Sequence, residues 1–125
     1  MINAKIQRLA WAIMIAEGWD STNNSLTYRN HNPGALRSSP IALGKRDGFA
    51  YFLNDSVGFL ALCWDLAKKC RGETVTGLTP QSTIEELVRV YTAETDLFKI
   101  KNYVWLAETI TGKKKETKLE YFVNI

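Results

Sequence analysis

The chain has 125 residues, of which 46% are hydrophobic and 23% charged, and this is the composition of a folded protein and not of a disordered segment. The length predicts one domain, residues 1–125, that can bury a core without staples. The formal net charge is only +3, and both signs are interspersed along most of the chain. A nucleic-acid binder would concentrate its lysines and arginines on one recognition element, so we expect no nucleic-acid partner.

Targeting and cofactor signals are absent from the sequence. No apolar run approaches the roughly 20 residues that span a bilayer, so we expect no membrane insertion. The N-terminus also lacks the pattern of a signal peptide, which predicts synthesis in the cytoplasm and delivery to any outside target by another route. Cys63 and Cys70 would lie about 10 Å apart along one helix, too far for a disulfide. With one histidine in the chain, we expect free thiols, no metal site, no cofactor and a monomer.

The first third of the chain predicts a helix followed by a long loop. Asn3 is a suitable helix cap, and glycine at position 18 is a suitable stop. Between them the apolar residues recur at the spacing of an amphipathic helix: Ile6, Leu9, Ala10, Ile13 and Met14. Residues 18–40 are rich in turn formers and predict a loop. Short apolar patches at 41–43 and 49–52, separated by glycines, then predict a small hairpin within residues 36–54.

The remaining chain predicts three more helices. The second is capped by Asp55 or Ser56 and ends near Gly72. The third follows a capping box from Ser82 to Glu85, the fourth runs from about Asp96 to Gly112, and residues 113–125 fit a helix or a strand. The expected fold class is mainly helical, of the α+β kind, with a small β-hairpin lobe after the first helix.

Glu17 is placed where a surface carboxylate is not expected. It lies eleven positions after Ile6, which at 100° per residue brings it to within about 20° of the apolar face. Burial there would raise the pKa of its carboxyl, and a glycosidase needs such a protonated carboxyl as its general acid. The alternative is that the last turn of the helix frays and Glu17 reaches water.

The loop after Glu17 carries amides and aromatic rings, which are the groups that bind sugars. Asn32-Pro33-Gly34 also forms a turn whatever else it does, and such a turn can aim its neighbours at a cleft. Phe49 and Tyr51 alternate along the expected strand, so they either line that cleft or pack across the hairpin. The polar and aromatic loop residues are Trp19, Tyr28, Arg29, Asn30, His31, Asn32 and Arg37.

Three stretches resemble bacteriophage-associated lysozyme-like proteins of the lytic transglycosylase and muramidase superfamily. The first ends the first helix, the second is the Asn-Pro-Gly loop, and the third is the expected hairpin strand. Later residues, Tyr91-Thr92-Ala93 with Asp96 and Asn102-Tyr103, are similar to the C-terminal segment of that group. The three stretches are Ile15-Ala16-Glu17-Gly18-Trp19, Tyr28-Arg29-Asn30-His31-Asn32-Pro33-Gly34-Ala35-Leu36-Arg37 and Gly48-Phe49-Ala50-Tyr51-Phe52.

The resemblance implies a lysozyme-like fold that cleaves the β-1,4 bond between N-acetylmuramic acid and N-acetylglucosamine, with peptidoglycan strands as the partner and Glu17 as the acid. His31 and Ala35 stand where asparagine is usual in that group. The resemblance also leaves an alternative, a non-catalytic wall-binding component of a phage particle or secretion machine. In either case the protein would act on the cell wall after export by another route or as part of a virion.

The rest of the expected site follows from the chemistry of glycosidases. A second carboxylate is normal, and the candidates are Asp20 and Asp47, although both also read as turn residues. Lytic transglycosylases need none, because the 6-hydroxyl of muramic acid attacks internally, so hydrolysis and anhydro formation both stay open. Tyr91 is also readable as a core residue with its hydroxyl on a backbone carbonyl. The expected glycan-positioning residues are Tyr28, Asn30, Asn32, Phe49 and Tyr91.

Overall fold

The computed structural model describes residues 2–19, 25–92 and 97–123. These form a mainly helical structure with one two-stranded antiparallel hairpin after the first helices, as the coarse fold class predicts. The elements in chain order are α1 (Ala4–Ala16), α2 (Leu26–Arg29), β1 (Gly44–Arg46), β2 (Phe49–Tyr51), α3 (Asp55–Arg71), α4 (Ile84–Thr92), α5 (Leu97–Thr111) and α6 (Glu120–Val123).

The helix α1 forms as its sequence predicts. The Asn3 side chain caps it by accepting a hydrogen bond from the Ile6 backbone N–H at 2.9 Å. Gly18, with φ of +80°, follows its last turn. The buried residues of α1 make up one face, which packs against α3 and α5: Ile6, Leu9, Ala10, Ala12 and Ile13.

The helix α3 is confirmed, but its cap is Asn54 and not Asp55 or Ser56. The Asn54 side chain accepts from the Val57 backbone N–H at 2.9 Å, which places Asp55 in the first turn. The helix ends where expected, with Gly72 in the left-handed conformation. Its two cysteines are free, as predicted, and burial raises their thiol pKa values, to about 11 for Cys63 and about 12 for Cys70.

The capping box of α4 begins one residue later than predicted. Thr83 and Glu86 form it, because the Glu86 backbone N–H donates to the Thr83 hydroxyl at 3.2 Å and Glu86 accepts from the Thr83 N–H at 3.1 Å. The Ser82 hydroxyl instead accepts from the Thr79 backbone at 3.0 Å. The start predicted for the fourth helix, Asp96, lies outside the described residues, and α5 ends before Gly112 as expected.

The segment predicted to be all loop contains the short helix α2, capped by the Ser25 hydroxyl. The hairpin that follows is confirmed, but its first strand is residues 44–46 and not the apolar patch at 41–43. Ile41 and Ala42 instead pack on a small cluster beneath the hairpin. Asp47 and Gly48 make the two-residue turn with φ of 54° and 82°, a geometry that matches the twist of the strands.

The C-terminal segment holds both of the structures left open. Residues 120–123 form α6, and Lys118 makes an isolated antiparallel bridge with Thr83. This arrangement ties the end of the chain to the start of α4.

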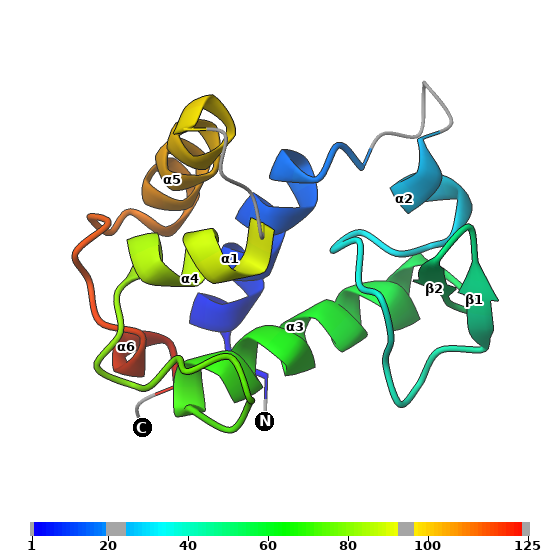
Figure 1. Cartoon of the computed structure of the whole chain (residues 1–125), viewed down its shortest axis with the longest axis horizontal. Coiled ribbons are helices and arrows are strands. Elements are labelled where there is room, and N and C mark those ends of the chain that lie inside the picture. The colour runs from blue at the N-terminus through cyan, green and yellow to red at the C-terminus, as the bar shows by residue number, and fades with distance from the viewer. Residues whose placement is uncertain (1, 20–24, 93–96, 124–125) are drawn as a thin grey trace.

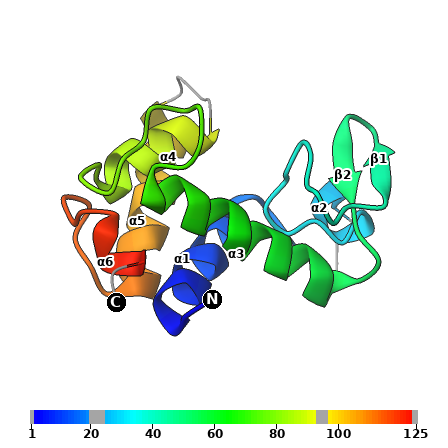
Figure 2. The ribbon, with the colours of Figure 1, turned by 90° about the horizontal axis from the view of Figure 1, so that it is seen from below.

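The elements form two ends joined by α3 (Figures 1 and 2). The helices α1, α4, α5 and α6 gather around one end of α3, and α2 lies with the hairpin at the other end. The main core fills the helical end, while a separate small cluster of Leu36, Ala50, Phe52 and Ala61 lies at the hairpin end. The end of α1 and the Asn-Pro-Gly loop therefore come between two separately packed parts.

Candidate functional site

Glu17 is the C-cap of α1, immediately before the chain turns into Gly18. Its backbone N–H donates to the Ile13 carbonyl at 2.8 Å, so the last turn of the helix is intact at this residue. Its side chain is half-buried, as its place at the end of the apolar face predicts. The frayed arrangement considered from the sequence is not the one observed.

The surroundings of Glu17 favour a protonated carboxyl. Burial raises its pKa above the ordinary value, and this effect outweighs two opposing ones. The Tyr103 hydroxyl donates a hydrogen bond to Glu17 Oε2, and the Lys99 ammonium adds a positive charge nearby; both lower the pKa. The net result is a raised pKa in a carboxyl that stays partly open to solvent, which is the state of a usable general acid.

Cavities lie on two sides of Glu17. The loop-side cavity has a volume of about 220 Å³, and the α5-side cavity one of about 640 Å³. Glu17 lines both, so an extended molecule lying across them would pass its carboxyl. The loop-side cavity is lined by Glu17, Ser25, Leu26, Thr27, Asn30, Asn32, Ala35 and Phe49. The α5-side cavity is lined by Ala16, Glu17, Phe98, Lys99, Asn102 and Tyr103.

Asn30 and Asn32 line the loop-side cavity, but their amides bind the protein backbone. Asn32 is only 1% exposed, and its Nδ2 donates to the carbonyls of Leu36 and Ala50, at 2.9 Å each. Its Oδ1 accepts from the Leu36 N–H at 2.9 Å. Asn30 Nδ2 donates to the Arg46 carbonyl at 3.2 Å. These bonds tie the loop to the hairpin and thereby shape the cavity wall.

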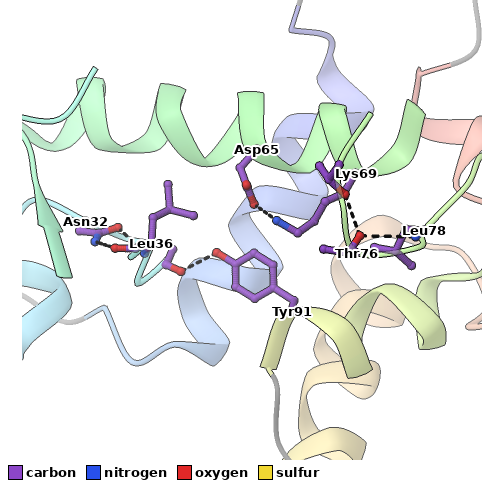
Figure 3. A network of polar contacts seen from close by, with 9 residues as sticks. Asn32, Leu36, Asp65, Lys69, Thr76, Leu78 and Tyr91 are labelled. Carbon is purple, nitrogen blue, oxygen red and sulfur yellow. Dashed lines mark hydrogen bonds and ion pairs between the residues drawn. The ribbon is translucent and has the colours of Figure 1, made fainter. Parts of the chain in front are cut away.

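Tyr91 reaches from α4 to the same loop (Figure 3). Its hydroxyl donates to the Gly34 carbonyl at 2.5 Å, which is the arrangement that its alternative interpretation describes. Burial is the largest cause that raises its phenol pKa, followed by the negative charges of Asp65 and Glu17. Tyr91 does not line either cavity in the described structure, so its place is that of a positioning residue for the loop.

The aromatic residues of the prediction separate in the structure. Phe49, on β2, lines the loop-side cavity, and the Arg37 guanidinium lies 4.4 Å from the centre of its ring. Tyr28, on α2, meets the Trp19 ring edge-on with centroids 5.5 Å apart. Among the described residues Tyr28 is not in the lining of either cavity. Phe49 is thus the aromatic ring placed to contact a ligand on the loop side.

Neither candidate for a second carboxylate is placed beside Glu17. Asp20 lies outside the described residues. Asp47 is exposed in the turn of the hairpin and is absent from the lining of both cavities. Of the residues that the structure describes, Glu17 is the one carboxylate that lines either cavity.

The two departures from the family pattern share one backbone conformation. His31 and Ala35 both have φ of +52°, in the left-handed region that asparagine tolerates better than most residues. Asparagine at these positions therefore suits the shape of the loop, whether or not it also touches sugar. His31 gains a local bond instead, from its Nδ1 to Asp55 Oδ1 at 2.7 Å.

Sequence reasoning assigned no role to Tyr103 or Lys99, although the structure brings both to Glu17. The two residues are four apart on α5 and so share a helix face, which is the local signal that they could act together. What the local pattern lacks is the partner, because Tyr103 is 86 positions from Glu17 along the chain. The packing of α1 on α5 makes this contact.

Comparisons of the chain with protein-family models, with curated proteins and with solved structures found no match. Within residues 2–19, 25–92 and 97–123, no group of three or more His, Cys, Asp and Glu side chains could hold a metal ion. In the same ranges no helix has the length and apolar character needed to cross a membrane.

Proposed function

We propose that the protein is a peptidoglycan glycosidase with a lysozyme-like fold and with Glu17 as its general acid. The observation that carries the proposal is a half-buried carboxyl with a raised pKa, situated between two cavities and held by a hydrogen bond. The resemblance of three sequence stretches to lysozyme-like muramidases and lytic transglycosylases supports the same activity. The division into a helical end and a hairpin end supports the fold.

The mechanism follows from the position of Glu17. A glycan strand lies across the two cavities, with one sugar against Phe49 and the next beside α5. Protonated Glu17 donates its proton to the glycosidic oxygen between them, and the bond to the anomeric carbon breaks. The Tyr103 hydroxyl then stabilises the carboxylate that forms, because a hydrogen bond to the charged form favours it.

The number of carboxylates bears on the product. Hydrolysis with inversion or retention uses a second carboxylate, and Asp47 is too far from the site's lining to serve. Internal attack by the muramic acid 6-hydroxyl uses Glu17 alone, first as acid and then as base, and releases 1,6-anhydro ends. We therefore propose the anhydro route, with Asp20 as the residue that a hydrolytic product would implicate.

The test is a turbidity assay on purified peptidoglycan with the native protein, Glu17→Gln and Glu116→Gln. Glu116 is exposed and lies outside both cavities, so its variant controls for the loss of one negative charge. We expect lysis by the native protein and Glu116→Gln, and none by Glu17→Gln. Retention of the native protein on the wall without any lysis would contradict the enzyme and indicate the non-catalytic wall-binding component.

A further inference from the structure

The α5-side cavity differs chemically from the loop-side cavity. Its α5 wall carries Lys99, Asn102 and Tyr103, which share a helix face because they are three and four positions apart. Phe98 stands at the same wall with 85% of its surface exposed. This wall therefore combines an ammonium group, an amide and an apolar ring, whereas in its described part the loop-side cavity is lined by no cationic side chain.

We propose that the α5-side cavity is a subsite for a carboxylate carried by the glycan, with the Lys99 ammonium as its partner and the Asn102 amide beside it. The inference rests on the proposed function only in taking a glycan as the ligand. In peptidoglycan such a carboxylate comes from the lactyl group of a peptide-free muramic acid or from the attached stem peptide. Both sources present the same chemistry, so Lys99 would make the protein select acidic glycans over neutral ones.

The electrostatics of Glu17 support this subsite. Lys99 lies close enough for its charge to lower the pKa of the Glu17 carboxyl. The other groups that act on Glu17 or feel its charge are Tyr103, from α5, and Tyr91, from α4. A carboxylate bound to Lys99 would offset the ammonium charge, so Glu17 would hold its proton more firmly once an acidic glycan is in place. Binding of the acidic ligand and readiness of the acid would then be coupled.

The neighbouring residue Lys101 offers a matched control. It lies on the same helix, it is exposed like Lys99, and it is absent from the described lining of the α5-side cavity. Lys101→Gln therefore removes the same charge from the same helix without altering the subsite. Any effect of net charge alone would appear equally in both variants.

The experiment measures binding by calorimetry in proteins that all carry Glu17→Gln, so that no ligand is cleaved. The ligands are an N-acetylglucosamine tetrasaccharide, a peptide-free tetrasaccharide that alternates N-acetylglucosamine with N-acetylmuramic acid, its methyl ester, and the same saccharide with stem peptides. At low salt we expect at least one acidic ligand to bind about fivefold more tightly than the neutral one, as for one partly exposed ion pair. Whichever acidic ligand does so identifies the source of the carboxylate.

We expect Lys99→Gln to erase this preference, Lys101→Gln to keep it, and the methyl ester to bind the parent protein like the neutral saccharide when the lactyl group is the source. An equal preference in Lys99→Gln, or equal binding of acidic and neutral ligands by the parent, would overturn the subsite while leaving the glycosidase standing. Binding of no saccharide would overturn both. Selective binding together with a native protein that does not lyse the wall would keep the subsite and remove the enzyme.

Discussion

Replacement of Gly58 by alanine tests how the structure holds the Asn-Pro-Gly loop. Gly58 is a buried residue in the first turns of α3, and a Cβ atom there would lie 1.8 Å from the His31 carbonyl oxygen and 3.0 Å from Pro33 Cδ. The oxygen belongs to the backbone, so no side-chain rotation relieves the clash. The loop and the helix would have to separate by about 1.2 Å to bring the first distance to 3.0 Å, which real Cβ atoms still avoid.

Two opposing effects decide the magnitude for Gly58→Ala. Alanine in a helix interior is more favourable than glycine by about 1 kcal/mol. Overpacking of a tight interior costs about 1–3 kcal/mol or more, and a clash with backbone belongs at the upper end. We therefore expect the free energy of unfolding to fall by about 2 kcal/mol, which lowers the Tm of a chain of this size by about 6–10 °C.

The same substitution should damage activity beyond its effect on stability. The displaced loop carries Asn30 and Asn32, which line the loop-side cavity, and an error of about 1 Å in the position of reacting groups can lower a rate by about 100-fold. The assays are urea denaturation, and peptidoglycan lysis at a temperature where the variant is folded. Ser56→Ala, at an exposed position of the same helix, is the control and should change neither strongly. A Gly58→Ala protein as stable as the native one would refute the reasoning.

Three further substitutions test single contacts. Ala35→Asn should raise the free energy of unfolding by about 0.5–1 kcal/mol in urea, because asparagine tolerates the φ of 52° better than alanine; no gain would contradict this. Tyr91→Phe should lower the same quantity by about 1–2 kcal/mol, because the Gly34 carbonyl loses its donor, and a neutral effect would be evidence against that bond. Tyr103→Phe removes a hydrogen bond that lowers the pKa of Glu17, so that pKa rises and the alkaline limb of the pH profile of lysis moves to higher pH. A limb that stays in place or moves to lower pH would show that Tyr103 does not act on the acid.

Periodicity was sufficient to locate the main helices and the face on which Glu17 lies, because both depend on local spacing. It was not sufficient to choose among neighbouring caps. Asn54, Asp55 and Ser56 can all cap a helix, and the choice depends on which residue keeps extended backbone angles. Asn54 does so, and the same ambiguity explains why the box before α4 begins at Thr83.

Composition identified the loop but not what its amides do. Asn30 and Asn32 were expected to hold sugar, yet a loop buried beneath a hairpin must first satisfy its own backbone groups. The side chain of Asn32 does this for Leu36 and Ala50. Pairings between distant segments, such as Tyr103 with Glu17 and Gly58 with His31, depend on how whole helices pack and leave no local pattern in the chain.

The central claim is that Glu17 breaks a glycosidic bond, and the most direct measurement is mass spectrometry of the fragments released from purified peptidoglycan. We predict that the native protein releases fragments with new 1,6-anhydro muramic acid ends and that Glu17→Gln releases none. New reducing ends would keep Glu17 as the acid and point to Asp20 as the second carboxylate. The absence of any new glycan ends from a folded native protein that binds the wall would contradict the claim.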